Sequence, residues 1–279
     1  MFGSEKKPRV ESRDRDREST PRPSLGSRPR VETESRDERL VFLIFFKLLL
    51  SSFFSIQNSV NSIEGVAISE YASTENFKCL KENFTIKFVI VSAAKNGTID
   101  DLAKNNIRNA YAAGIEDVDI KITINFVKPR KIVNHTPREI IVSILNELNK
   151  NNLKIGKIWF DIAGDAGMNN ANRTYRWYED KERNIKFIEE MIEILKENNK
   201  LNGIYSSKSH WTSITGNTQK FKEIPLWYNS FDEINNFNDY TNKFFGGWKY
   251  PYVKTYDYRK DVIDKSCGTR PYFAYCWKT

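Results

Sequence analysis

The sequence has few of the residues that most often bind metal ions or phosphate groups. Among 279 residues there are only two histidines, His135 and His210, and three cysteines, with no Cys-X-X-Cys pair. A zinc site is not expected, because structural zinc needs four closely spaced Cys or His ligands. No internal repeat is visible, and the one glycine pair, Gly246-Gly247, is not followed by a helical pattern that could hold a phosphate. We therefore expect no metal and no cofactor.

The first 39 residues have almost no large apolar side chains. They combine eleven Lys/Arg with nine Asp/Glu and four prolines. Such a segment cannot bury enough surface to offset the entropy of ordering, so residues 1–39 are predicted to be a disordered charged leader. A basic arm that binds nucleic acid is the alternative. The interleaved acids leave a net charge of only about +2, which argues against a nucleic-acid partner.

One long apolar run follows, and it is short for a membrane span. Residues 40–56 (LVFLIFFKLLLSSFFSI) number 17 and include Lys47, whereas a spanning helix needs about 20 largely apolar residues. A secretory signal core has this shape, and Val60-Asn61-Ser62 would allow cleavage after Ser62. Residues 40–62 are therefore predicted to be a signal peptide core, with an uncleaved type II membrane anchor or a misplaced start site as alternatives. We expect a secreted protein that contacts a membrane only if this segment is retained.

Four Asn-X-Ser/Thr sequons agree with export. They are candidate N-glycosylation sites, and they begin at Asn83, Asn96, Asn134 and Asn172.

The three cysteines are Cys79, Cys267 and Cys276. They allow one disulfide and one leftover thiol, and the sequence alone does not give the pairing. A Cys79–Cys267 bridge would tie the first helix to the last strand. Closing so long a loop would stabilise the fold by roughly 5 kcal/mol on the chain-entropy model.

Residues 63–279 alternate short apolar runs with helical patterns. Strands are expected where β-branched and aromatic residues cluster, at 65–69, 88–94, 117–124, 157–164, 201–207, 225–231, 251–257 and 271–275. The first four have apolar centres, which is typical of strands buried on both faces of a parallel sheet.

Helices are expected between the first strands, each with a start signal or an apolar stripe. They cover 74–82, 98–114 with Thr98 as the cap, 136–152 with Thr136 as the cap and Pro137 in the first turn, and 178–199. Five β/α units and three further strands predict an α/β fold, an incomplete β/α barrel of the TIM-barrel type. An open doubly wound sheet is the alternative. The 217 residues from 63 to 279 suit one such domain.

Seven short stretches along this domain carry a resemblance to a known family. They are GVAIS (65–69), FKCL (77–80), IWFDIAG (158–164), GIYSSKSHW (203–211), PLWY (225–228), FGGWKYPYVKTY (245–256) and CG (267–268). Together they resemble the glycoside hydrolase family 25 lysozymes, and most closely the nematode-type lysozymes of that family. The resemblance implies a barrel with five helices and eight strands. It also implies cleavage of the β-1,4 bond between N-acetylmuramic acid and N-acetylglucosamine in peptidoglycan.

The resemblance further implies where catalytic carboxylates should stand. Glycoside hydrolysis uses a carboxylic acid as proton donor and a second carboxylate, and the family carries both as Asp-X-Glu at the end of the fourth strand. Asp161 matches the Asp, but Ala163 stands at the proton donor. Ala67 replaces an aspartate of the first strand, and Tyr272 falls at or near a fourth acidic position. Since general acid catalysis typically contributes about 10²–10⁴-fold, this pattern predicts a lysozyme-like protein with degraded catalytic acids.

Three hypotheses of function remain open. The first is a secreted lysozyme-like protein that retains glycan binding but has lost or weak hydrolase activity, in innate defence or bacterial digestion. The second is an active N-acetylmuramidase with an atypical acid, for which Asp165 is a rescue candidate. The third is a secreted barrel used only for protein–protein contact.

Aromatic residues near the predicted strand ends are candidates for stacking on sugar rings, with ordinary core packing as the alternative. They are Tyr175, Trp177, Tyr178, Tyr205, Trp227 and Tyr256. Lys249 and Lys254 are candidates for contact with anionic wall groups, and solvated lysines are the alternative. The net charge of residues 63–279 is about +5, from 32 Lys/Arg and 27 Asp/Glu, and suits an anionic partner such as bacterial peptidoglycan. We expect a monomer.

Overall fold

The computed structural model describes residues 62–95, 98–124, 127–128, 131–132, 136–164, 177–257, 266–269 and 272–277. The predicted leader, residues 1–39, and nearly all of the predicted signal or anchor segment, residues 40–62, lie outside these ranges. None of the helices within the described ranges is both long enough and apolar enough to cross a membrane.

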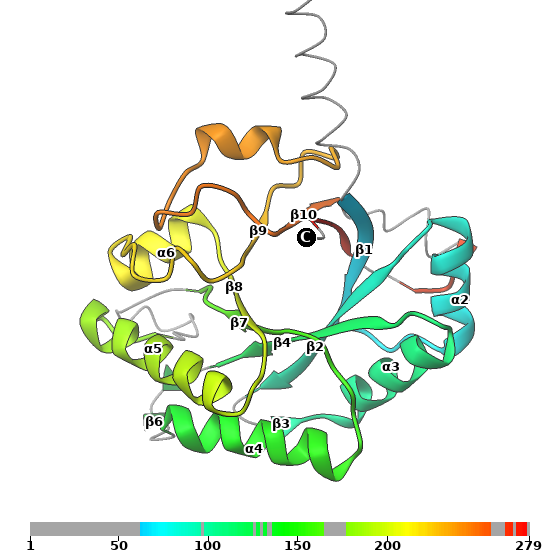
Figure 1. Cartoon of the computed structure of the whole chain (residues 1–279), viewed down its shortest axis with the longest axis horizontal. Coiled ribbons are helices and arrows are strands. Elements are labelled where there is room, and N and C mark those ends of the chain that lie inside the picture. The colour runs from blue at the N-terminus through cyan, green and yellow to red at the C-terminus, as the bar shows by residue number, and fades with distance from the viewer. Residues whose placement is uncertain are drawn as a thin grey trace, which may run out of the picture. The chain divides into compact units, whose positions relative to one another are not determined.

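Eight strands form a ring in which each strand pairs with the next (Figure 1). Around the ring they are β1 (Ser62–Ile68), β2 (Phe88–Lys95), β4 (Asp117–Thr123), β7 (Ile158–Asp161), β8 (Asn202–Tyr205), β9 (Leu226–Asn229), β10 (Val253–Asp257) and β11 (Tyr272–Trp277). Neighbours from β1 to β10 are parallel, and β11 is antiparallel to both β10 and β1. Three short strands are additional, namely β3 (Thr98–Ile99), β5 (Val127–Lys128) and β6 (Lys131–Ile132).

Five α-helices surround this ring in the described part of the chain, which confirms the predicted incomplete β/α barrel (Figure 1). They are α2 (Thr74–Asn83), α3 (Asp101–Ala112), α4 (Pro137–Lys150), α5 (Lys181–Glu197) and α6 (Lys208–Thr215), and a 3-10 helix, η1 (Asn238–Asn242), follows β9. Thr136 caps α4 as predicted, in a reciprocal capping box with Glu139. The predicted cap Thr98 was wrong: Asp100 caps α3, because Thr98 pairs with Lys95 in the β2–β3 ladder.

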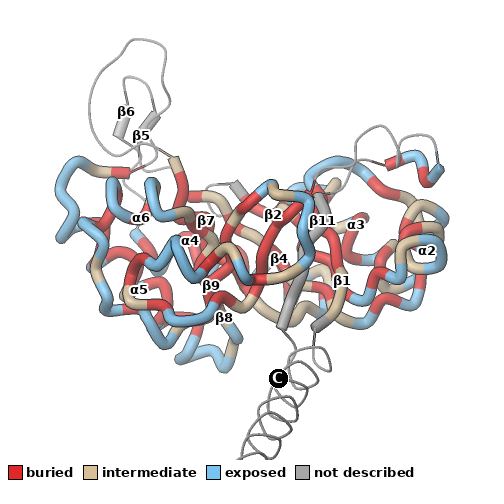
Figure 2. The backbone as a smooth tube through the Cα atoms, turned by 90° about the horizontal axis from the view of Figure 1, so that it is seen from above, coloured by how far each residue is buried: buried red, intermediate tan, exposed pale blue. Residues whose placement is uncertain are grey.

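Two apolar clusters divide the core. The larger lies between the ring and the helices, and the smaller lies inside the ring around Trp159, Phe88 and Trp227. Figure 2 shows the buried residues concentrated along the strands and the exposed ones on the outer turns. The expectation that β4 is apolar on both faces was wrong, because its burial alternates. Its outward residues are apolar, whereas its inward residues, among them Asp119 and Lys121, are polar and reach the interior of the barrel.

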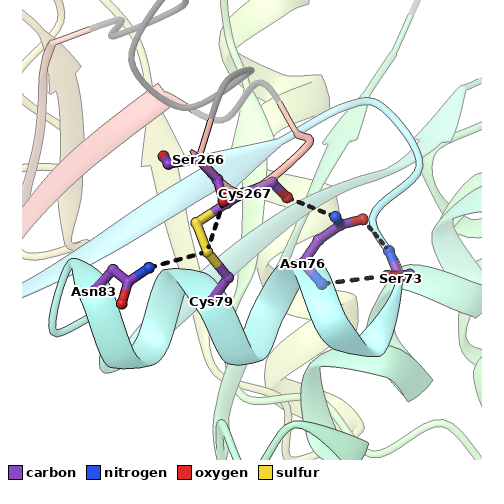
Figure 3. The surroundings of a disulfide bond; sticks show 6 residues. All are labelled: Ser73, Asn76, Cys79, Asn83, Ser266 and Cys267. Atoms are coloured by element: carbon purple, nitrogen blue, oxygen red, sulfur yellow. Dashed lines mark hydrogen bonds between the residues drawn. A yellow bond between two sulfur atoms is a disulfide. The ribbon is translucent and has the colours of Figure 1, made fainter.

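A disulfide joins α2 to the segment before β11 (Figure 3). It links Cys79 to Cys267, with Cα atoms 5.5 Å apart and a sequence separation of 188. Beside it, Asn76 Nδ2 donates to the carbonyl oxygen of Cys267 at 2.6 Å, so a hydrogen bond supports the same junction. Asn83, the one sequon asparagine among the described residues, is exposed on α2 with its Nδ2 3.3 Å from Cys79 Sγ. Asn96, Asn134 and Asn172 lie outside the described ranges.

Lys254 on β10 anchors the loop that follows β9. Its side chain is 0% exposed, and its Nζ donates to Asp232 Oδ2 at 2.7 Å and to Asp239 Oδ1 at 2.9 Å. It also donates to the carbonyl oxygens of Ile234 and Asn236. Contact between Lys254 and an external anion was therefore a wrong expectation, because the ammonium group is enclosed by the protein's own acceptors.

Asp239 collects the donors of this network. Lys243 Nζ lies 2.8 Å from Asp239 Oδ2, and the Tyr228 hydroxyl donates to Asp239 Oδ1 at 2.7 Å. Burial alone would raise the pKa of Asp239, but the hydrogen bonds from Lys243 and Lys254 outweigh it and hold the pKa well below its usual value. Burial and the bond to Asp239 raise the pKa of Tyr228 in turn.

Removing the disulfide should destabilise the barrel without changing its fold. We expect Cys79→Ser/Cys267→Ser to lower the free energy of unfolding by about 2–5 kcal/mol, measured by urea denaturation, because the open chain gains entropy in the unfolded state. Reducing agent should produce the same loss in the natural protein and no further loss in the double variant. A double variant as stable as the natural protein would contradict this expectation.

Removing the buried lysine should cost more than removing an exposed one. We expect Lys254→Met to lower the free energy of unfolding by about 3–5 kcal/mol, because it removes the buried cation from Asp232 and one of the two cations from Asp239. Lys249→Met is the matched control, since Lys249 is exposed, and should change stability by less than about 0.5 kcal/mol. Equal losses in the two variants would show that the network contributes nothing specific.

Candidate functional site

A pocket of about 380 Å³ opens where the carboxyl ends of the parallel strands meet. The described residues that line it are Ala67, Ile68, Ser69, Ser92, Lys121, Tyr205, Trp227, Asn229, Phe231 and Thr255. Eight of these ten come from the second half of a strand or from the loop that follows, whereas Trp227 is the second of the four residues of β9 and Thr255 is the central residue of β10. Active sites of β/α barrels lie at this end, because the strand-to-helix loops gather there.

Asp161 ends β7 beside this pocket and is only 6% exposed. Its Oδ2 accepts a hydrogen bond from Thr123 Oγ1 at 2.9 Å and lies 3.7 Å from Lys121 Nζ. Thr123 and Asp161 are register partners on β4 and β7, so the strand pairing itself creates this contact. The carboxylate is thus placed as an acceptor between a hydroxyl group and an ammonium group.

The predicted positions of lost acids lie at the same end of the barrel. Ala67 lines the pocket, and the Cα register of β1 and β11 pairs it with Tyr272. Ala163 follows β7 two residues after Asp161 and is buried, and its carbonyl oxygen accepts from Trp177 Nε1 at 3.3 Å. A methyl side chain at 67 or 163 can neither donate nor accept a proton. Among the described residues that line the pocket, Lys121 carries the one charge.

Two of the predicted sugar-contact residues come together in the pocket wall. The ring centroids of Tyr205 and Trp227 lie 4.5 Å apart, with the planes inclined by 58°. Asn229 Nδ2 contacts the Tyr205 hydroxyl, and Trp227 Nε1 donates to Thr255 Oγ1 at 2.8 Å. Hydrogen bonds with residues that also line the pocket therefore hold the two aromatic rings in place.

The other predicted aromatic contacts lie elsewhere. Trp177 is buried in the outer core, and Tyr178 packs against that core with the Arg183 guanidinium 3.6 Å from its ring centroid. Tyr256 also belongs to the outer core, and its hydroxyl donates to Glu64 Oε2 at 2.7 Å. None of the three is among the described lining residues. Tyr175 and Asp165 lie outside the described ranges.

Lys121 is the most informative residue that the sequence interpretation missed. Its Nζ lies 4.7 Å from the ring centroid of Tyr205 and 5.6 Å from that of Trp227, within the range of cation–π attraction. The sequence did contain a signal for it. In DVDIKIT, residues 117–123, every second residue is polar, so a period of two places Lys121 on the same inward face as Asp119 and Thr123.

Trp159 forms the floor beneath these rings. It is fully buried, and its ring meets that of Trp227 edge-on with centroids 5.8 Å apart. A Cβ at Gly203 would lie 2.3 Å from the Trp159 ring, so the neighbouring strand must carry glycine there. Asp119 Oδ2 accepts from Trp159 Nε1 at 2.8 Å, and Oδ1 accepts the backbone N–H of Lys157. Desolvation raises the pKa of Asp119 to about 6, although these two hydrogen bonds act to lower it.

Comparison with known proteins agrees with this fold. The family model described as "Lysozyme-like protein 1" matches residues 58–256. The chain is 33% identical over 224 residues to "Probable GH family 25 lysozyme 2" of Dictyostelium discoideum, which covers 80% of this chain and 95% of that protein. It is 28% identical over 207 residues to "Lysozyme-like protein 5" of Caenorhabditis elegans, covering 73% and 86%.

Solved structures share the fold at lower identity. A family GH25 lysozyme from Aspergillus fumigatus superposes with a TM-score of 0.54 at 17% identity, covering 78% of this chain and 94% of that one. The autolysin LytC of Streptococcus pneumoniae, solved in complex with a synthetic peptidoglycan ligand, gives 0.59 at 14% identity, covering 77% and 47%. With the sequence matches, these results show that the chain belongs to the glycoside hydrolase family 25 lysozymes.

The raised pKa of Asp119 predicts a pH dependence of stability. The folded chain keeps this proton up to about pH 6, whereas the unfolded chain releases it near 3.8. The contribution of Asp119 to the free energy of unfolding should therefore fall by about 2–3 kcal/mol as pH rises from about 4 to about 6.

Asp119→Asn should remove this fall, measured as the difference from the natural protein in urea unfolding between pH 4 and 7. Glu116→Gln is the control, because Glu116 is an exposed carboxyl three residues away. A difference between Asp119→Asn and the natural protein that stays constant with pH would contradict the assignment.

Proposed function

We propose that this protein binds peptidoglycan-type glycan in the mouth of the barrel and hydrolyses it weakly or not at all. One observation carries the proposal. The pocket combines a Tyr205–Trp227 wall with polar side chains, while Ala163 occupies the position expected to hold the proton donor.

Binding is supported by the chemistry of the lining. Sugar rings stack on aromatic faces through their C–H groups, and their hydroxyls need donors and acceptors at the edges. Tyr205, Trp227 and Phe231 supply faces, and a second set supplies hydrogen bonds at strand ends, namely Ser69, Ser92, Asn229 and Thr255. The peptidoglycan ligand of the LytC complex supports the same class of partner.

Weak hydrolysis is expected from the contacts that Asp161, the one retained acid, makes with its neighbours. A glycosidic oxygen leaves readily only if a carboxylic acid protonates it. Asp161 accepts from Thr123 and faces Lys121, so it is arranged as an acceptor and not as a donor. With alanine at 67 and 163, we expect a rate lower by at least about 10²–10⁴-fold than that of a relative with its acids intact.

Export and a role in innate defence or bacterial digestion belong to the same proposal. The Cys79–Cys267 disulfide supports folding in an oxidising compartment, and Asn83 is exposed as a glycan acceptor must be. Cleavage after Ser62 would leave Ile63 as the first residue, one position into β1.

Release of soluble muropeptides tests the hydrolytic part of the proposal. The full chain is incubated with bacterial peptidoglycan beside Ala67→Asp/Ala163→Glu, and fragments are identified by mass spectrometry. We expect release only from the double variant, because it restores one carboxylate in the pocket lining and a second one two residues after Asp161. Ala67→Asn/Ala163→Gln is the matched control, with the same shapes and no acid. Release by the natural protein at a rate similar to that of the double variant would overturn the claim of weak hydrolysis and make Asp165 the candidate acid.

Sedimentation with insoluble peptidoglycan tests the binding part separately. We expect the natural chain and Ala67→Asn/Ala163→Gln to sediment with peptidoglycan. The affinity of a Trp227→Ala/Tyr205→Ala variant for peptidoglycan should be at least about tenfold lower, because it has lost the aromatic rings on which sugars stack. If the natural chain does not sediment, glycan binding is wrong and a role in protein–protein contact takes its place.

A further inference from the structure

A sequon lies within contact distance of the Cys79–Cys267 disulfide. Asn83 is the last residue of α2, one turn after Cys79, and its Nδ2 lies 3.3 Å from Cys79 Sγ. Figure 3 shows Asn83 and Asn76 on either side of Cys79 along the helix. Asn76 is tied to the carbonyl oxygen of Cys267, whereas the side chain of Asn83 is exposed. The amide nitrogen that a glycan would modify is therefore beside the sulfur.

Cys79 Sγ is the sulfur that a reductant can reach more easily. Cys79 is half-buried, whereas Cys267 is only 5% exposed. A thiolate breaks a disulfide by attacking one sulfur and displacing the other, so the rate depends on access to the attacked sulfur. Cys79 Sγ lies 3.3 Å from the carbonyl oxygen of Ser266 and 3.3 Å from Asn83 Nδ2. A bulky group on that nitrogen would stand next to the attacked atom.

The backbone at the sequon holds its threonine in an unfavourable conformation. Thr85 has a φ of 54°, in the left-handed region that β-branched residues rarely adopt. Glycine or asparagine suits such a position better. Thr85 is exposed, and its hydroxyl completes the Asn-X-Thr acceptor that begins at Asn83. A role in glycosylation gives a chemical reason for a threonine at this strained position.

We infer that Asn83 carries an N-linked glycan that shields the disulfide from thiol reductants. The inference rests on the proposed export, because the glycan is added on the secretory route. An oligosaccharide linked to a lipid pyrophosphate is the donor. A bond forms between Asn83 Nδ2 and C1 of the first sugar, the C1–O bond to the pyrophosphate breaks, and the amide proton leaves with the lipid pyrophosphate. Nδ2 keeps one N–H for Cys79 Sγ, so the first sugar is attached to the atom that contacts the sulfur.

The reaction that this glycan hinders is thiol–disulfide exchange. A thiolate attacks Cys79 Sγ and releases Cys267 as a thiolate, and a second thiolate then releases Cys79 from the mixed disulfide. Two reductant thiols are oxidised to one disulfide, and the two cysteines are reduced. The sugar occupies space that the first thiolate needs, so it slows this step, and it does so more strongly for a large reductant than for a small one.

The test compares the reduction of the secreted full chain with and without this glycan. Peptide mass spectrometry on the chain secreted by a eukaryotic host measures the occupancy of Asn83. Reduction under native conditions, by dithiothreitol and by thioredoxin, is followed by alkylation of the new thiols. Thr85→Asn removes the sequon and suits the left-handed backbone. We expect this variant to be reduced by dithiothreitol at least about tenfold faster than the natural protein, and by thioredoxin with a larger factor.

Two controls separate the glycan from the substitution. Thr85→Ser retains the sequon and should be reduced at the natural rate. Produced in bacteria without glycans, the natural chain and Thr85→Asn should be reduced equally fast. Thr98→Ala removes the sequon at Asn96 instead and should leave the rate unchanged. Thr98 pairs with the last residue of β2, whereas Asn83 precedes the first, so the two sites lie at opposite ends of that strand.

The outcomes separate this inference from the proposed function. If the chain is retained in the cell without glycans, the proposed export fails and the inference fails with it. A secreted chain with Asn83 unmodified, or a glycosylated chain that is reduced as fast as Thr85→Asn, would overturn the inference and leave export intact. Equal factors for dithiothreitol and thioredoxin would overturn it too, because a glycan that only stabilises the fold does not distinguish reductants by size. A larger factor for thioredoxin, seen only with the glycan, supports it.

Discussion

Joining strands into a ring sends every second side chain into an interior that no helix can reach, and the rest of this molecule depends on that constraint. The interior must be filled from within, and Phe88, Trp159 and Trp227 do most of the filling. Trp159 fits only because the adjacent strand has Gly203, and its indole N–H is satisfied by Asp119. Because Trp159 fills the interior, the rings of Tyr205 and Trp227 pack above it in fixed positions. The polar residues at the strand ends then surround the pocket that remains.

The same constraint determines the chemistry at the mouth. Asp161 and Thr123 meet because their strands are in register, and Lys121 reaches Asp161 from one inward position lower on β4. A carboxylate in a glycosidase pocket serves catalysis only if its neighbours leave it a role in proton transfer or in stabilising positive charge. Here its neighbours include a hydroxyl donor and an ammonium group, and Ala163, two residues further along the chain, carries only a methyl group. The arrangement favours binding of a polar ligand over its hydrolysis.

Much of the fold could be predicted from the sequence because the strands are rich in β-branched residues and α4 has a strong capping box. Thr98 was misassigned because a two-residue strand lies immediately before Asp100, and pairing with β2 is not visible from local sequence. In the site, Tyr205 and Trp227 were correctly predicted as candidates, but Tyr256 follows the inward residue Thr255 and belongs to the outer apolar cluster instead. Lys121 was missed because the strand was interpreted as apolar throughout, although polar and apolar residues alternate along it in the sequence. The contact between Lys121 and Asp161 needs the register of two strands that are 38 residues apart, and no local pattern contains it.

The disulfide has a consequence that goes beyond added stability. Cys79 lies in the first helix of the barrel and Cys267 just before its last strand, so the bond closes a covalent loop between two residues that are 188 positions apart. A protease that cuts any single surface turn within this loop cannot release a fragment, because both new ends remain attached through the sulfur atoms. The strands on either side of the cut stay at high local concentration and can pair again. For a protein exposed to digestive enzymes, such a loop means tolerance of nicks: the barrel can be cut once and still be one molecule.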